Sequence, residues 1–333
     1  MKTNPNPDKS ISKICRITYL LPLIAPIVVI TTFVFFYKAF LFCSANNPCS
    51  PVSAAQIFAG VGDSDQVRVS AYVGRATWTL VNGVHLLACL VTFATAGIVI
   101  YNALSLQYDR KVRWMIVLIV GAMALDISLA MAWWTAGDIW SPAQQLFRAT
   151  VGQVVPAINK YNRVAEALSL GGALSLAAAA SSALWQRTSN DDQDELLKRV
   201  RLLRPILMVG ATALVVAILR LSVTHAWAAS YLIPESPLAK NVSSLVTGIV
   251  VSMGTVYTLL MASIYLPAAL MLRTRVLKLA AGKTDQEQEK FLSDNGLNLS
   301  FMQLLPRVLA LFAPLLAGPL GELLVRATKE LGG

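Results

Sequence analysis

The stretch TLVNGVHLLACLVTFATAGIVIY, residues 79–101, decides the fold class. It contains no Lys, Arg, Asp or Glu, and a helix of about 20 mostly apolar residues is long enough to cross the hydrocarbon core of a bilayer. Trp78 precedes the stretch and Tyr101 ends it. Such rings favour the headgroup level of a membrane. We therefore interpret the stretch as a transmembrane helix.

Five further apolar blocks of similar length occur in the chain. They are residues 19–42, 114–134, 164–185, 205–227 and 243–272. Of the 333 residues, 56% are apolar and 14% are charged, whereas an ordinary soluble domain carries about a quarter charged residues. This composition excludes a disordered chain, a disulfide-dense secreted scaffold and an ordinary soluble enzyme. We predict an all-α polytopic membrane helix bundle with six transmembrane helices.

The distribution of basic residues predicts the orientation of the bundle. With six spans, the N-terminus, two loops and the C-terminal tail share one side, which holds 20 Lys and Arg against six on the other side. Basic loops stay in the cytoplasm. Both termini are therefore predicted to be cytoplasmic, in the inner membrane of a bacterium. Topology and attraction to anionic lipids at the cytoplasmic face explain the net charge of +10 without a nucleic-acid partner.

The predicted spans divide the chain into three parts. They are a basic cytoplasmic N-terminus (1–18), a six-helix domain (19–272) and a cytoplasmic helical tail (273–333). Two outer loops, 43–78 and 135–163, exceed the length at which loops are usually plain connectors. Both contain apolar residues, so we expect them to pack on the outer face of the bundle. The alternative is that both are solvated connectors.

The tail has capping-box spacing at two places, which predicts helices from about Asp285 and Phe301. The second helix enters the apolar stretch 308–325, which two prolines and Glu322 interrupt. We interpret this stretch as a segment lying on the inner face of the membrane. A seventh span is the alternative. Residues 187–204 are acidic first and basic last, which predicts a short amphipathic helix leading into the fifth span at Pro205.

Two of the four cysteines can form a disulfide. Cys43 and Cys49 flank an Asn-Asn-Pro sequence on the predicted outer side, and such a sequence favours a turn. The compartment outside a bacterial inner membrane is oxidising. We predict a Cys43–Cys49 disulfide that holds the end of the first span. Two free thiols are the alternative.

Four ionisable residues stand out within the predicted spans, and each needs a partner because it costs about 2.5–3.5 kcal/mol in a bilayer. They are Lys38, His85, Asp126 and Arg220. Lys38 lies near the end of its span and can extend its amine to the headgroups. The other three fall at a similar depth in the outer half of the membrane. We predict an Asp126–Arg220 ion pair with His85 nearby. The pair either fixes helix register or forms a site for a solute, ion or proton; alternatively, Arg220 reaches the outer surface unpaired.

Small and polar residues at helical spacing predict which helix faces point inward, because residues three and four apart share one face. Three such stripes are Asn82, His85, Cys89 and Thr92; Gly210, Ala213, Ala217, Arg220 and Thr224; and Ser244, Gly248, Ser252 and Thr255. In the fourth span, Gly171, Gly172, Ser175, Ala179 and Ser182 permit a close approach of helices. We expect all four sets to face the interior.

Two classes of function remain after the motifs are considered. The chain contains no G-x-S-x-G, H-E-x-x-H, Walker A or G-x-G-x-x-G motif, so we expect no catalysis, cofactor or metal. One class is a structural, interaction or sensor component of a membrane assembly, with a protein partner or a second copy of this chain. The other is a transporter or channel for a small solute or ion, with a polar site near Asp126 and Arg220.

Overall fold

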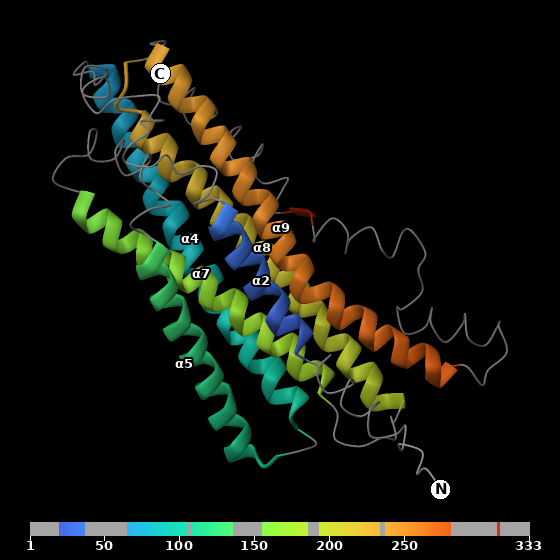
Figure 1. Ribbon diagram of the computed structural model, residues 1–333. Helices are drawn as coiled ribbons and strands as arrows, with labels where there is room; N and C mark the ends of the chain where they lie inside the picture. The colour runs from blue at the N-terminus through green and yellow to red at the C-terminus, as the bar shows by residue number, and fades with distance from the viewer. Residues whose placement is uncertain are drawn as a thin grey trace, which may run out of the picture.

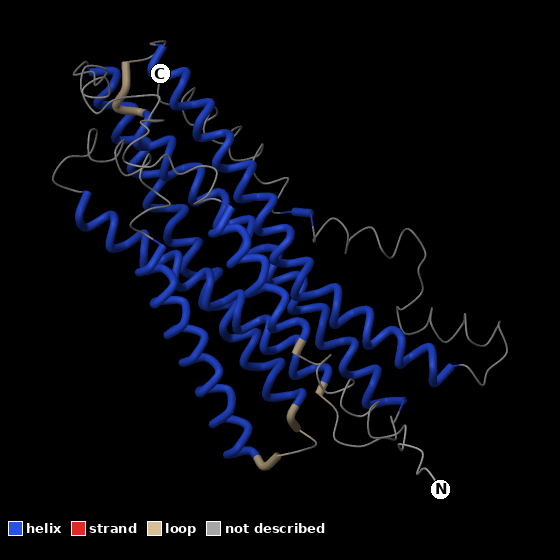
Figure 2. Tube along the Cα trace, viewed as in Figure 1, coloured by secondary structure: helices blue, strands red, loops and turns tan. Residues whose placement is uncertain are grey.

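The computed structural model describes residues 20–36, 65–105, 108–135, 155–185, 193–233, 237–280 and 312–313. Six helices make up nearly all of this part: α2 (Leu21–Phe36), α4 (Asp65–Ala103), α5 (Arg110–Thr135), α7 (Val155–Leu184), α8 (Gln193–Ala229) and α9 (Pro237–Ala280). They lie side by side in an elongated bundle, and from α4 onward each helix runs opposite to the one before it (Figures 1 and 2).

Five of these helices are long and apolar enough to cross a membrane, namely α4, α5, α7, α8 and α9. The predicted all-helical membrane bundle is confirmed at this level. The apolar part of α2, Leu21–Thr32, is shorter. The rest of the predicted first span, and the predicted helices of the tail, lie outside the described residues. The count of six spans and the cytoplasmic tail therefore stay predictions.

The apolar core lies where α7 meets α4, α8 and α9. The face of α7 toward this core is rich in alanine, and Ala177, Ala180 and Ala183 have no exposed surface. Leu184 of α7 and Ile206 of α8 are also fully buried. Small side chains let helices approach closely, which matters in lipid because burial of apolar groups provides no driving force there. α5 packs mainly on α7 and α2 on α9, so both lie at the periphery.

The five long helices extend beyond the predicted spans, and in α4, α7 and α8 the extension changes the predicted organisation. α4 begins at Asp65 and α7 at Val155, so residues 65–78 and 155–163 of the predicted outer loops are helical. α8 is one helix from Gln193 to Ala229 and contains Pro205. The predicted amphipathic helix and the fifth span are therefore a single element. Charged side chains limited the predicted spans, but they do not interrupt a helix whose ends leave the hydrocarbon.

The predicted close approach at α7 is confirmed. A Cβ atom added at Gly171 would lie 3.0 Å from the ring of Phe93, and one at Gly172 would lie 3.1 Å from Thr92. Of the other three members, Ser175 and Ala179 are buried and Ser182 is half-buried. The α4 and α8 stripes also face inward, since Asn82, His85, Cys89 and Thr92 are buried, as are Gly210, Ala217, Arg220 and Thr224, with Ala213 half-buried.

The prediction that the Ser, Gly and Thr stripe of α9 faces the interior is wrong. Ser244, Gly248 and Thr255 are exposed, and Ser252 is half-buried. The buried face of α9 instead carries apolar side chains such as Val250, Met253 and Met261. The hydroxyl of Thr255 donates to the Val251 carbonyl oxygen one turn earlier at 3.0 Å. A threonine bonded within its own helix needs no partner on another helix, so its position does not indicate an interior face.

Two glycines of α4 should respond oppositely to the same substitution. A Cβ atom added at Gly74 would lie 2.9 Å from Trp227 Cδ1 and 3.3 Å from Trp227 Cα, whereas one at Gly83 would meet nothing within 4 Å. We expect Gly74→Ala to lower the free energy of unfolding by about 1–3 kcal/mol through overpacking. Gly83→Ala should leave it unchanged or raise it by up to about 1 kcal/mol. Unfolding in mixed micelles checks both, and equal losses would contradict the contact at Gly74.

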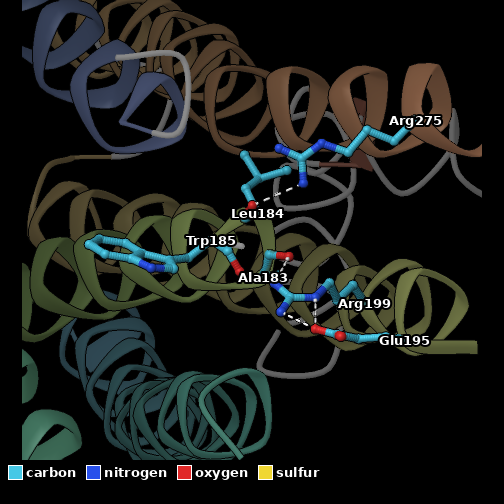
Figure 3. A network of polar contacts seen from close by, with 6 residues as sticks. All are labelled: Ala183, Leu184, Trp185, Glu195, Arg199 and Arg275. Carbon is cyan, nitrogen blue, oxygen red and sulfur yellow. Dashed lines mark hydrogen bonds and ion pairs between the residues drawn. The ribbon is translucent and has the colours of Figure 1, made fainter. Parts of the chain in front are cut away.

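Two arginines bind the C-terminal end of α7, where helix carbonyls lack partners within the helix. Arg199 of α8 donates from Nη1 to the carbonyl oxygens of Ala183, at 3.2 Å, and Trp185. Its Nε and Nη2 donate to Glu195 Oε1 at 3.0 and 2.5 Å. Arg275 of α9 donates to the Leu184 carbonyl oxygen at 3.2 Å. Figure 3 shows the two side chains converging on this end, so one cluster joins α7, α8 and α9.

Candidate functional site: a buried polar centre

Arg220 of α8 is the centre of a polar cluster inside the bundle. Its side chain is buried, with 6% of the residue exposed. Nε donates to Asn82 Oδ1 of α4 at 3.0 Å, and Nη2 donates to Asn162 Oδ1 of α7 at 2.7 Å. One cation therefore bonds to two other helices. The acceptors are neutral amides, so the positive charge is solvated by oxygen atoms without being neutralised by them.

His85 lies one turn further along α4 from Asn82 and is 1% exposed. Its Nε2 is 2.7 Å from Ser169 Oγ of α7 and 3.7 Å from Cys89 Sγ. The Ser169 hydroxyl donates to the Ala165 carbonyl oxygen at 3.0 Å, so its oxygen is left to accept a hydrogen bond from His85 Nε2. This pattern places the proton of a neutral His85 on Nε2. Its Nδ1 is buried and has no hydrogen-bond partner in the described part of the chain.

Three aromatic rings, which we call the aromatic cap, cover the centre toward the end of the bundle where α4 begins, the predicted outer end. The ring of Trp78 lies 5.4 Å from that of Tyr161 and 5.2 Å from that of Trp227. Trp78 Nε1 donates to Thr224 Oγ1 at 3.2 Å, and Thr224 Oγ1 donates to the Arg220 carbonyl oxygen at 2.7 Å. Trp227 is only 3% exposed. These rings therefore pack on one another inside the bundle.

A small cavity adjoins the centre on its other side. It has a volume of about 20 Å³, and Cys89, Thr92 and Ser169 supply the polar part of its lining. Gly172, Gly210 and Met261 are among the other residues that line it. A cavity needs roughly 10–15 Å³ to hold a water molecule. This one is large enough for one water and far too small for an organic solute.

Of the residues predicted to form a polar site, the structure brings together His85 and Arg220 and leaves Asp126 apart. His85 is near enough to Arg220 for the two to interact electrostatically. Asp126 is exposed on α5, which packs on α7 and, less extensively, on α4. The predicted Asp126–Arg220 pair is therefore not present, because α5 lies at the periphery and does not border α8 closely. Lys38, Cys43 and Cys49, with the predicted disulfide, lie outside the described residues.

Four contributors to the centre were missed by sequence reasoning. Asn162 was assigned to an outer loop, because Lys160 and Arg163 seemed to end the span. Glu166 of α7 was overlooked, although both it and Arg220 interact electrostatically with Tyr257 of α9. The other two are Ser169 and Trp78. Extending the helical period backward from Ser169 to residues 166 and 162 would have found the α7 members, since all three lie on one face.

The chemistry of the centre is that of a buried cation with hydrogen-bonding neighbours. No group of three His, Cys, Asp or Glu in the described residues could hold a metal ion. The guanidinium holds three helices in register through its bonds to two amides. Its charge can also attract an anion or a polar solute if the bundle opens. These two uses correspond to the two classes of function that the sequence leaves open.

Comparison with known proteins supplies no further information about the role of this centre. No protein-family model, curated protein or solved structure matches the chain. The length and apolar composition of its helices identify the chain as a helical membrane protein, with five helices able to span a bilayer.

Proposed function

We propose that the chain is a non-enzymatic structural and interaction component of a membrane assembly, in a bacterial inner membrane with both termini in the cytoplasm. The observation that carries this proposal is the bonding of Arg220, which joins α8 to Asn82 of α4 and Asn162 of α7. In this role the polar centre holds the helices together, and the outer surface of the bundle binds the other members of the assembly. Anionic lipids would contact the basic residues at the predicted cytoplasmic end.

The surroundings of Arg220 favour a structural role, in which it joins helices, over a role in a path for a solute or ion. The aromatic cap covers it toward one end of the bundle, and the adjoining cavity holds one water at most. A polar network inside a membrane is expected to be satisfied by its own members, because water is not available to replace a missing partner. The two asparagine oxygens accept hydrogen bonds from two of the three guanidinium nitrogen atoms, Nε and Nη2.

The second candidate is a carrier for a proton, an ion or a small polar solute. Its specific support is His85, whose Nδ1 is buried without a hydrogen-bond partner among the described residues, close to Arg220. The one-water cavity beside Ser169 and Cys89 could connect this ring to a path that opens transiently. An intramembrane histidine next to such a cavity is a recognised arrangement for proton transfer.

Labelling of Cys89 distinguishes the two candidates. In a variant with the other three cysteines replaced by alanine, we expect a water-soluble maleimide to react with Cys89 at least about 100-fold more slowly than with a cysteine introduced at exposed Asp109. The measurement uses membranes with both faces open to the reagent. Slow labelling is expected if the polar centre only joins helices and is closed to water. Labelling at a rate near that of the Asp109→Cys control would show that water reaches the centre and would favour the carrier.

A further inference from the structure

Asp126 stands alone on the outward face of α5. It is exposed and lies within the apolar span Arg110–Ala130. Its neighbours on this face are the exposed Met123 and Ile127. Among the described residues, no hydrogen bond or ion pair involves its carboxylate. Figure 1 shows α5 at the edge of the bundle, where nothing that the structure describes covers this side.

The depth of Asp126 places its carboxylate in the hydrocarbon. The rings of Tyr101 and Trp114 pack at 5.1 Å, and the Arg113 guanidinium lies 4.2 Å over the Tyr101 ring, which marks one membrane boundary. Asp126 lies twelve residues beyond Trp114, or about 18 Å at 1.5 Å per residue, in a core about 30 Å thick. An aspartate has one methylene and cannot extend to the headgroups as a lysine can. Facing lipid, the group would cost about 2.5–3.5 kcal/mol.

The surface beside Asp126 admits another helix closely. Ala130, one turn after Asp126, is exposed. Ala122, one turn before Asp126, is exposed. Small residues next to a polar one are the combination by which spanning helices associate, because backbones approach and the polar group finds a partner. The small side chains and the carboxylate of this face therefore both favour a transmembrane helix as its occupant.

We propose that Asp126 binds a spanning helix of a different membrane protein, one that carries a Lys or Arg at the same depth. This inference rests on the proposed role in a membrane assembly and identifies Asp126 as the residue that contacts the partner protein. A carboxylate in hydrocarbon calls for a cation or several donors, and a basic side chain on a partner helix supplies both charge and hydrogen bonds. The partner helix lies along the face formed by Leu118, Ala122 and Asp126.

A second copy of the chain fits this face less well. Across a two-fold axis through α5, Asp126 would meet Asp126 of the copy, and like charges repel. The exposed basic side chains of the described part lie outside the predicted apolar spans, as Arg75, Lys111 and Arg204 do. Arg220 lies at membrane depth, but it is buried and bonded to Asn82 and Asn162. The described part of the chain therefore supplies no cation to Asp126, and we assign the cation to another protein.

The test places a photo-crosslinking amino acid at single exposed positions of the full chain in its native membrane. Ala122 and Met123 probe the α5 face, and Leu90 of α4 and Leu259 of α9 are matched exposed controls. We expect the α5 probes to yield a crosslinked peptide from a spanning segment of another protein that contains Lys or Arg. Asp126→Leu should reduce this product at least about 10-fold, a change of about 1.4 kcal/mol. Asp126→Glu should retain it, and exchanging the two charges between the partners should restore it.

Each other outcome contradicts the inference in a distinguishable way. Products with lipid alone from α5, together with protein products from α4 or α9, would leave the assembly role standing and reject Asp126 as its contact. Lipid products from all four positions would reject both. Peptides of this same chain crosslinked to α5 would reject a different protein as the occupant. A partner segment without Lys or Arg, or a yield unchanged in Asp126→Leu, would reject the ion pair.

Discussion

Asn82→Leu is expected to lower the free energy of unfolding by about 3 kcal/mol. The substitution removes one of the two oxygens that accept hydrogen bonds from Arg220, at 3.0 Å, and leaves a buried guanidinium with Asn162 alone. Removing one partner of a buried charge costs more than the bond itself is worth, since the charge stays desolvated. Titration of the purified protein with sodium dodecyl sulfate in mixed micelles measures the change. Asn102→Leu, an exposed position near the other end of α4, is the matched control and should change stability by less than about 0.5 kcal/mol.

A triple variant distinguishes two roles of the polar centre around Arg220, namely joining helices and binding a ligand. Replacing Arg220, Asn82 and Asn162 together with leucine removes the charge and both of its acceptors, so neither a guanidinium nor an amide of this network is left without its partner. We expect the stability of this variant to return to within about 1 kcal/mol of the wild type, because apolar replacement of a whole buried network is often neutral. If the polar centre only joins helices, crosslinking at α5 should persist in the triple variant. Loss of function with restored stability would instead assign a binding role to the centre.

Two helix faces that the sequence predicted correctly, those of α4 and α8, share a simple property. On α4 and α8, the polar residues at three-four spacing include groups that a helix cannot satisfy within itself, such as His85 and Arg220, so their face had to be inward. On α9 the stripe contains only Ser, Gly and Thr, and Thr255 bonds to its own backbone. Lipid tolerates such a face. A polar stripe with a charge or a ring nitrogen therefore predicts burial on α4 and α8, whereas hydroxyls and glycines did not suffice on α9.

The predicted ion pair was wrong because the sequence does not determine which helices are neighbours. Similar depth made Asp126 and Arg220 plausible partners, but α5 packs on α7 and lies away from α8. Arg220 takes its acceptors from α4 and α7, and Asn162 had been assigned to a loop. The sequence predicted the need of each charged group for a partner. It could not predict that Arg220 finds its partners inside the bundle, whereas Asp126 is left on the surface.

Arg199→Met is expected to lower the free energy of unfolding by about 2–3 kcal/mol, with the loss arising at the end of α7. Methionine keeps the apolar part of the buried side chain but removes the donors to the Ala183 and Trp185 carbonyl oxygens. Hydrogen bonds from a charged group are worth about 1.5–3 kcal/mol. Glu195, which is 29% exposed, pairs with Arg199 within one helix. Such exposed pairs contribute about 0.3–0.5 kcal/mol, so Glu195→Gln should cost much less.

Hydrogen exchange locates the effect, because the two variants should differ at the backbone of α7. In Arg199→Met, the amides of residues 181–184 should exchange faster, since the arginine no longer holds the helix end against α8. Arg201→Met is the matched control, as Arg201 is exposed and its loss removes the same charge from the same predicted cytoplasmic segment. Equal effects of the two substitutions would mean that basic charge at this end, through topology or lipid, explains the result. A loss confined to Arg199→Met would show that the two carbonyl bonds hold α7 to α8.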